Sequence, residues 1–249
     1  IEFIEKAGIE SLHSIDGMFA IGAYDQKFKN LLIARDRFGQ KPLYYLSENG
    51  LFAFASEMSA LIELSDLIKM EISVESISQY FTLRYIQAPE TAIKQIKKLE
   101  PGQYMIYGQK GYTVKDRYFT PNKNGTQCCN DISQAPGKLL SDEPEKVIHK
   151  LLTKSIEKTV PDNAAMIVSG GVDSTLMAAY TRAIDKQKGK NLRRKAYTMQ
   201  LEHQQTEDSD WAENLCKEWG WDHQVINMSD RQLINAYMKL IEKLDEPLG

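Results

Sequence analysis

Residues 169–174, with the sequence SGGVDS, have the composition of a phosphate-binding turn. They follow an apolar stretch, 164–168, that predicts a strand, and they precede a stretch, 174–186, that predicts a helix. Two consecutive glycines let the backbone turn without Cβ clashes, so that its amides can surround an anion. The N-terminal end of the helix adds partial positive charge and unpaired N–H groups. The segment therefore predicts an anion site between a strand and a helix.

The carboxylate of Asp173 narrows the kind of anion. A carboxylate repels phosphate, so its presence indicates that Mg²⁺ lies between Asp173 and the phosphate oxygens. The hydroxyls of Ser169, Ser174 and Thr175 supply further donors. The segment lacks the lysine and the spacing of a Walker A loop, so we expect a pyrophosphate with its metal. The alternative is that the glycines only make a tight connection, with Asp173 or Ser174 as the helix cap.

The elements around this segment alternate between helix and strand. Alternation of this length predicts right-handed crossovers and a parallel sheet, whose ligands bind at the carboxyl ends of the strands. Residues 169–174 lie at such an end. The predicted helices are 143–160, 174–186, 209–219 and 230–244, and the predicted strands are 164–168, 195–201 and 223–227.

Residues 1–119 have a different pattern, which predicts an α+β unit with a mostly antiparallel sheet. A turn at Asn49-Gly50 favours a hairpin because both residues tolerate positive φ. Two helices are expected to begin at the caps Ser56 and Ser73. They span 56–64 and 73–80, and a helix-like run covers 2–12. The predicted strands are 18–24, 30–34, 42–46, 51–55, 103–107 and 112–117. Residues 120–142 lose all periodicity and predict a linker, with an ordered surface excursion as the alternative.

Composition limits the classes of partner. The 249 residues are 42% hydrophobic and 26% charged, with a net charge of −3, as in a globular protein without a basic groove for nucleic acid. No apolar run has the length of a membrane span. Of three cysteines two are adjacent (Cys128 and Cys129), and the four histidines are scattered, so neither a disulfide framework nor a zinc site is expected. We expect a reducing, cytoplasmic setting.

The SGGVDS sequence resembles the Ser-Gly-Gly-[Val/Leu/Ile/Phe]-Asp-Ser motif of the N-type ATP pyrophosphatases, which adenylate a substrate and release pyrophosphate. Earlier segments resemble the class II glutamine amidotransferase domain of asparagine synthetases. These segments are 16–20 (DGMFA), 34–45 (ARDRFGQKPLYY), 54–61 (FASEMSAL), 99–102 (LEPG) and 117–119 (RYF). The resemblance covers nearly the whole chain in the right order. Taken by themselves, residues 34–45 predict two strands joined by a turn whose Arg35-Asp36 pair is structural.

The resemblance implies two domains. Residues 1–119 would be the C-terminal part of an Ntn-type glutaminase sandwich, 120–142 the linker, and 143–249 the N-terminal part of an α/β ATP pyrophosphatase domain. The implied activity is that of a glutamine-hydrolysing asparagine synthetase, which uses ATP and Mg²⁺. Ammonia from glutamine would attack an aspartyl-adenylate, with release of AMP and pyrophosphate. The implied partners are aspartate, glutamine or ammonia, and ATP, with neither nucleic acid nor membrane; a homodimer stays open.

The resemblance also implies site residues. Asp173 is the implied metal ligand. The nucleotide-binding residues carried over by position are Ile167, Ser169, Gly170, Gly171, Val172, Asp173, Ser174 and Met199. The alternative for Met199 is a core methionine. Asp208 matches an acid that opens the next helix in the family, and a plain capping role is its alternative.

Among the departures from the family, one concerns the catalytic nucleophile. The amidotransferase nucleophile is an N-terminal cysteine, whereas this chain begins with Ile1 and has no cysteine before Cys128. No catalytic residue for glutamine hydrolysis is therefore assigned, and the 249 residues are not expected to hydrolyse glutamine. We expect the 249 residues to be a fragment of a longer protein, and we expect both ends of that protein to be missing from this sequence. Two alternatives stay open: another carboxylate as acceptor, as in β-lactam synthetases, macrolactam cyclases or sugar-pathway amidotransferases, and a non-catalytic nucleotide-binding homologue.

Overall fold

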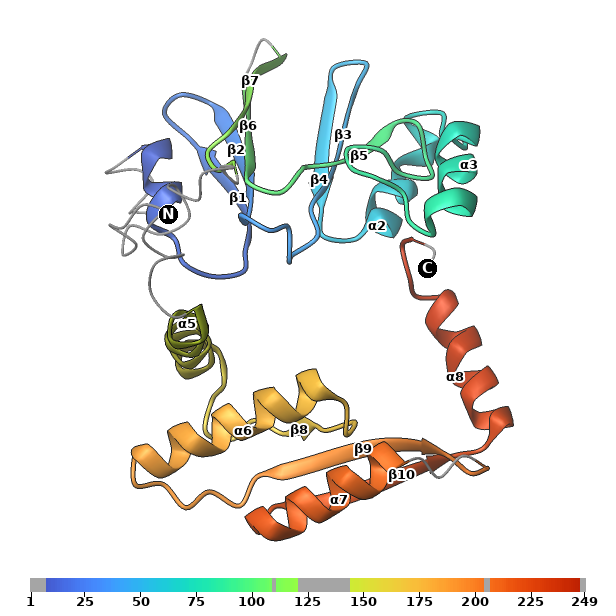
Figure 1. The fold of residues 1–249 in the computed structure, drawn as a ribbon. Coiled ribbons are helices and arrows are strands. Elements are labelled where there is room, and N and C mark those ends of the chain that lie inside the picture. Colours follow the sequence, from blue (N-terminus) through green and yellow to red (C-terminus); the bar gives the residue numbers. More distant parts are fainter. Residues whose placement is uncertain (1–7, 109–110, 121–143, 204–206, 247–249) are drawn as a thin grey trace. The chain divides into compact units, whose positions relative to one another are not determined.

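The computed structural model describes residues 8–108, 111–120, 144–203 and 207–246. By its internal contacts the chain divides into two compact units (Figure 1). The first unit comprises Ile1–Ser133 with Ile241–Gly249, and the second comprises Gln134–Leu240. The predicted linker, apart from Thr120, and the helix-like run before Gly8 lie outside the described residues.

A four-stranded antiparallel sheet forms one layer of the first unit. Its strand order is β1-β2-β6-β7. The first two strands form a hairpin, with Asp25 paired to Asn30 at its end. The strands are β1 (Ala20–Asp25), β2 (Asn30–Arg35), β6 (Gln103–Gly108) and β7 (Gly111–Arg117).

A second sheet of three strands has the order β4-β3-β5 and is also antiparallel. It contains β3 (Tyr44–Glu48), β4 (Leu51–Ala55) and β5 (Ile96–Lys98). Asn49 and Gly50 have φ values of 51° and 79°, so the predicted turn is confirmed. Residues from both sheets share a buried cluster, namely Ile33, Leu43, Tyr45, Leu99 and Met105. The first unit therefore has the mostly antiparallel α+β architecture that its sequence pattern predicts.

The helices of the first unit are short. They are the 3₁₀ helix η1 (Ile9–Ser14), α2 (Met58–Ile62), the 3₁₀ helix η2 (Glu63–Asp66) and α3 (Val74–Leu83). Ser73 caps α3 as predicted, because its hydroxyl accepts the N–H of Ser76 at 3.2 Å. The predicted cap at Ser56 is wrong. The N-cap position of α2 belongs to Glu57, whose side chain makes no cap hydrogen bond.

Asp245 supplies the missing cap of α2. Its carboxylate accepts the backbone N–H groups of Met58 and Ser59 at 2.7 and 3.0 Å. The next residue, Glu246, forms an ion pair with Lys98 at 2.7 Å. Burial, and then these two carboxylates, raise the pKa of the nearby Tyr44 phenol. Residues Ile241–Gly249 therefore belong structurally with the first unit.

The corner that follows β2 confirms the structural interpretation of Arg35-Asp36. The Arg35 guanidinium donates to three backbone carbonyls, and burial lowers its pKa. The Asp36 side chain is 1% exposed. It accepts the N–H groups of the turn residues Phe38, Gln40 and Lys41. Both charged side chains are thus committed to holding the backbone of the corner.

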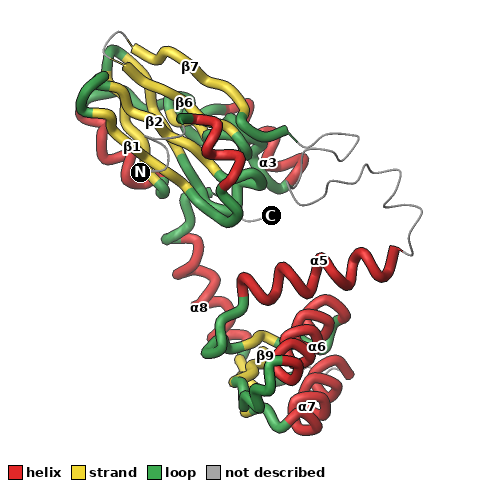
Figure 2. Tube along the Cα trace, turned by 90° about the vertical axis from the view of Figure 1, so that its left-hand side faces the viewer, coloured by secondary structure: helices red, strands yellow, loops and turns green. Residues whose placement is uncertain are grey.

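The second unit has a parallel sheet of order β10-β9-β8, and this confirms the prediction for the second half. The strands are β8 (Met166–Ile167), β9 (Lys195–Leu201) and β10 (Asp222–Met228). The helices are α5 (Pro144–Thr159), α6 (Val172–Gln187), α7 (Glu207–Trp219) and α8 (Asp230–Ile241). Helices α6 and α7 lie on the same side of β9 (Figure 2). The buried cluster between these helices and the sheet contains Val168, Ala178, Ala196, Ala212, Cys216 and Trp221.

A buried ion pair fixes the backbone that leads into β8. Arg194 and Asp185 form two hydrogen bonds, at 2.7 and 2.9 Å, and their side chains are 2% and 8% exposed. The Arg194 guanidinium also donates to backbone carbonyls of the segment before β8, at Pro161, Asp162 and Ala164. Helix α6, the strand β9 and the start of β8 are thus held by one guanidinium. Among the described residues, no helix is long and apolar enough to cross a membrane.

Candidate functional site

The SGGVDS loop, residues 169–174, joins β8 to α6 as the sequence predicts. Gly170 has a φ of 87°, a conformation that side chains with Cβ rarely adopt. Gly171 is the N-cap of α6, with φ −66° and no side-chain cap. The loop therefore ends at a helix N-terminus whose first N–H groups have no intrahelical acceptor. The end of the strand, the tight turn and the start of the helix thus lie within six residues of one another.

Hydrogen bonds inside the loop hold its shape. The Ser174 hydroxyl accepts the N–H of Ser169 at 3.1 Å and donates to the Gly171 carbonyl at 3.1 Å. The Ser169 and Ser174 hydroxyl oxygens are 2.9 Å apart, and the N–H of Gly171 donates to the Ser169 hydroxyl at 3.3 Å. Because Ser174 gives its proton to Gly171, Ser169 is the donor between the two hydroxyls. Both serines are thus bonded within the loop itself.

Gly170 lies against the start of α7. A Cβ at position 170 would come within 1.8 Å of the Asp208 carbonyl oxygen and 2.7 Å of its Cα. These are backbone atoms, so no side-chain rotation could relieve the contact. The structure therefore brings the backbone of Asp208, in the first turn of α7, beside the SGGVDS loop.

The carboxylate of Asp173 is in the first turn of α6 and is exposed. Among the described residues, no three His, Cys, Asp or Glu side chains form a metal-binding group. Mg²⁺ needs no such group, because it keeps several waters and binds through one or two carboxylates together with substrate phosphates. Asp173, with Asp208 nearby, fits a metal of that kind. Such a metal would offset the negative charge of a pyrophosphate.

An apolar strip lies on the sheet face opposite α6 and α7. Ile167 on β8 is 77% exposed and Met199 on β9 is 65% exposed. Ile167 pairs with Tyr197, and Tyr197 and Met199 share a face because they are two residues apart in a strand. Ile226 on β10 pairs with Met199 and is 46% exposed. Met199 is therefore not a core methionine within the described residues, and it shares the face of Ile167.

Val172, another predicted nucleotide-binding residue, is the first residue of α6 and is 82% exposed. The eight predicted site residues thus fall in two groups. Six form the SGGVDS loop, and two, Ile167 and Met199, are on the neighbouring strands. A planar apolar group could contact the strands while an anion contacts the loop.

A buried polar network behind the loop was not predicted. The Thr198 hydroxyl, on β9, donates to the carbonyl of Val168 at 2.5 Å. Nε2 of His223, on β10, is 2.8 Å from the same hydroxyl. Thr198 is 1% exposed and Val168 is fully buried. The only sequence signal was a threonine on the buried face of a strand, which points to a polar partner nearby.

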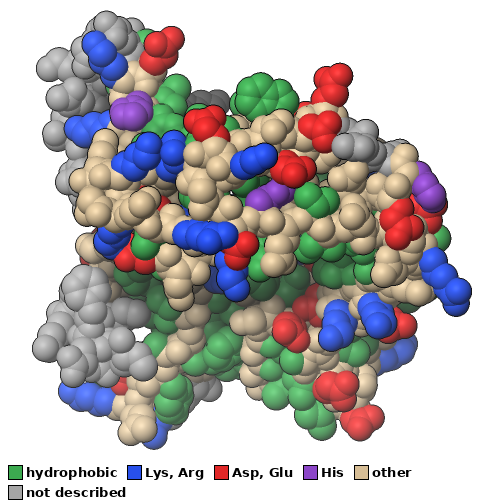
Figure 3. All heavy atoms as spheres, turned by 90° about the horizontal axis from the view of Figure 1, so that it is seen from below, with side chains coloured by type: hydrophobic (Ala, Val, Ile, Leu, Met, Phe, Trp, Pro, Cys, Tyr) green, Lys and Arg blue, Asp and Glu red, His purple; other side chains and the backbone are tan. Residues whose placement is uncertain are grey.

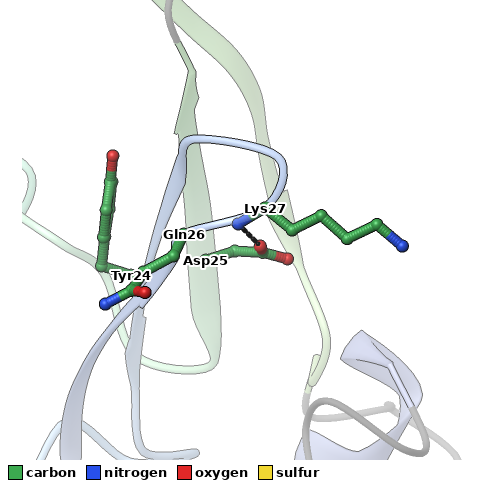
Figure 4. A pocket seen from close by; sticks show the side chains of 4 residues that line it. All are labelled: Tyr24, Asp25, Gln26 and Lys27. Carbon is green, nitrogen blue, oxygen red and sulfur yellow. Dashed lines mark hydrogen bonds between the residues drawn. The ribbon is translucent and has the colours of Figure 1, made fainter.

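Other surface features are less suited to chemistry. A hollow at the β1–β2 turn is lined by Tyr24, Asp25, Gln26 and Lys27 (Figure 4). The Asp25 carboxylate there already accepts the N–H groups of Lys27 and Phe28, as in an ordinary turn. On the face shown in Figure 3, Lys and Arg side chains are interspersed with Asp and Glu, so a basic stripe is absent from the described residues of that face.

Two family models match the chain. Residues 1–119 match the glutamine amidotransferase domain, and residues 148–249 match asparagine synthase. Bacillus subtilis asparagine synthetase [glutamine-hydrolyzing] 1 is 28% identical over 240 residues, which are 96% of this chain and 35% of that protein. B. subtilis asparagine synthetase [glutamine-hydrolyzing] 3 is 25% identical over 94% of this chain and 38% of its own length.

A Mycobacterium bovis protein, provisionally named asparagine synthetase [glutamine-hydrolyzing], is 30% identical over 245 residues. The match covers 97% of this chain and 36% of that protein. The chain thus spans somewhat more than a third of the length of these relatives. The matched residues extend through both units.

Proposed function

We propose that this chain, which joins a glutamine amidotransferase domain to an asparagine synthase domain, belongs to a ligase that amidates aspartate to asparagine with ATP and glutamine. The observation that carries the proposal is the SGGVDS loop at the carboxyl end of β8 and the N-terminus of α6. Open parallel sheets bind nucleotides at that position. The names of the two B. subtilis relatives, both asparagine synthetase [glutamine-hydrolyzing], also support the proposal.

In the proposed reaction, the aspartate side-chain carboxylate attacks the α-phosphorus of ATP and forms an acyl-adenylate. The bond between the α- and β-phosphates breaks, and pyrophosphate leaves. Ammonia from glutamine then attacks the acyl carbon to give asparagine and AMP. The SGGVDS loop would bind the leaving pyrophosphate through the Val172–Ser174 backbone N–H groups at the start of α6, and such fixed donors stabilise developing charge.

Mg²⁺, when bound, would supply positive charge to the pyrophosphate oxygens. Asp173 would hold it, and Asp208, whose backbone lies beside Gly170, is the candidate for a second acidic ligand. Ile167 and Met199 would contact the adenine from the open face of the sheet. A different acceptor carboxylate remains the rival function, since the described residues contain nothing that selects aspartate.

The reaction products test this proposal. The protein that carries this chain, supplied with aspartate, ammonia, Mg²⁺ and ATP, should form AMP and pyrophosphate in step with asparagine. Ammonia replaces glutamine in this assay, so that the result does not depend on glutamine hydrolysis. ADP and orthophosphate as primary products would contradict the proposal, whereas AMP formation with another carboxylate in place of aspartate would establish the rival function.

We further propose that the 249 residues do not hydrolyse glutamine on their own. Class II amidotransferases use an N-terminal cysteine as nucleophile, and no cysteine precedes Cys128. Expressed as printed, the polypeptide should release no more glutamate from glutamine than the uncatalysed background in a coupled assay. Clear turnover would show that another nucleophile acts, and the assignment of the first unit would have to change.

A further inference from the structure

The peptide unit that opens the SGGVDS loop is hydrogen-bonded at both of its polar ends. Its carbonyl, from Val168, accepts the Thr198 hydroxyl proton at 2.5 Å. Its N–H, from Ser169, donates to the Ser174 hydroxyl at 3.1 Å. A peptide unit is planar, so two bonds at its opposite ends fix the direction in which the chain leaves β8. The loop geometry therefore depends on a residue of β9.

The donors and acceptors in this network can be assigned. A carbonyl only accepts, so the single proton of Thr198 goes to Val168. The contact of 2.8 Å between Thr198 Oγ1 and His223 Nε2 then requires His223 to be the donor. Nε2 of His223 carries a proton in one neutral tautomer and in the imidazolium. The order of donation is thus His223 to Thr198 to Val168.

The network is shielded from water. Val168 is fully buried and Thr198 is 1% exposed, whereas His223 is only partly buried on β10. Water cannot readily replace the Thr198 hydroxyl as the partner of the Val168 carbonyl, and an unsatisfied buried carbonyl is costly. The backbone just after β8 is also held by the N–H of Val168, which donates to the Tyr197 carbonyl at 2.9 Å.

We propose that Thr198 and His223 are positioning residues of the nucleotide site, which set the orientation of the SGGVDS loop from the neighbouring strands. The proposal deepens the proposed function and rests on it, because it assumes that this loop binds the pyrophosphate of ATP. Neither side chain touches the phosphate. His223 acts by orienting the Thr198 hydroxyl, and Thr198 acts by holding the 168–169 peptide.

Matched substitutions separate a positioning role from a general structural one. Thr198→Val keeps the shape of the side chain and removes the hydroxyl, whereas Thr198→Ser keeps the hydroxyl. His223→Leu removes the donor, and His223→Gln restores an N–H near the same place. In the protein that carries this chain, the measurements are the Kd of Mg²⁺–ATP by calorimetry and hydrogen exchange of peptides that cover residues 167–175.

Thr198→Val should weaken ATP binding about tenfold, the equivalent of one hydrogen bond, and should speed amide exchange in the loop. Thr198→Ser and His223→Gln should stay within about threefold of the wild type, less than the loss of one hydrogen bond. Since His223 acts through Thr198, adding His223→Leu to Thr198→Val should weaken binding no further. If Thr198→Val does not fold, the comparison of His223→Leu with His223→Gln tests the same proposal.

Two results would overturn the proposal. One is wild-type affinity and wild-type exchange in a folded Thr198→Val or His223→Leu protein. The other is a double variant whose loss is the sum of the two single losses. Hydrogen exchange keeps this test separate from the proposed function: if the wild type binds no ATP, the function fails, while faster loop exchange in Thr198→Val still supports the positioning role and unchanged exchange refutes it.

Discussion

At the scale of single residues, the two glycines of the SGGVDS loop have different tasks. Gly170 has positive φ, and a side chain there would collide with the Asp208 backbone. Gly171 has an ordinary φ of −66°, and a Cβ there would only reach the Ser169 hydroxyl at 3.4 Å. The sequence predicted a tight turn from both glycines, but the need for Gly170 arises from α7, which the local pattern does not contain.

Substitution by alanine should separate these tasks. Gly170→Ala should destabilise the second unit by about 2 kcal/mol or more, through backbone strain and the contact with Asp208. Gly171→Ala should leave stability nearly unchanged, because φ is ordinary and the nearest contact is 3.4 Å away. Under the proposed function it should still weaken ATP binding, because it adds a Cβ to a loop whose amides would contact the phosphates. Denaturation followed by tryptophan fluorescence measures the first effect, and calorimetry the second. Equal stability losses in the two variants would contradict this division of roles.

At the scale of elements, sequence periodicity predicted the sheets and most helices. The antiparallel hairpins follow from alternating residues and the Asn49-Gly50 turn, and the parallel sheet follows from strand–helix alternation. The misplaced cap at Ser56 shows the limit of local patterns. The groups that cap α2 belong to Asp245, 187 residues away from Met58, and no local pattern contains such a partner.

The Asp185–Arg194 pair gives a test of how the segment before β8 is held. Asp185→Asn would leave the buried Arg194 charge uncompensated, so the second unit should lose about 3 kcal/mol of stability. All three tryptophans are in this unit, so their fluorescence during denaturation reports on it alone. As a control, Asp162→Asn removes the exposed partner of Lys190 and should change nothing measurable. An Asp185→Asn protein as stable as the wild type would refute this account.

At the scale of the whole molecule, the order of the two units along the chain was predicted, but the return of the last residues to the first unit was not. The predicted boundaries at 119 and 143 remain predictions. Internal contacts instead group Ile241–Gly249 with the first unit. The hydrogen bond from the Met58 N–H of α2 to Asp245 and the ion pair between Glu246 and Lys98 account for that grouping.

Asp245→Ala should therefore loosen the first unit at α2, although residue 245 is far from α2 in sequence. Loss of a helix cap costs about 1 kcal/mol, and the first turn of α2 should exchange its amide protons faster. Hydrogen exchange of peptides that cover Met58–Ile62 measures this. Lys243→Ala, a change at an exposed neighbour, is the control and should have no effect. Unchanged exchange in the Asp245 variant would show that the cap does not stabilise α2.

The central claim is that the SGGVDS loop binds the pyrophosphate of ATP through a metal held by Asp173. The most direct measurement is the rate of AMP formation from ATP, aspartate and ammonia in an Asp173→Ala variant of the protein that carries this chain. A Glu218→Ala variant, changed on the exposed surface of α7, serves as the control. We predict a loss of at least about 100-fold for Asp173→Ala, the size typical of lost charge stabilisation, and a wild-type rate for the control. AMP formation within a few-fold of wild type in a folded Asp173→Ala protein would contradict the claim.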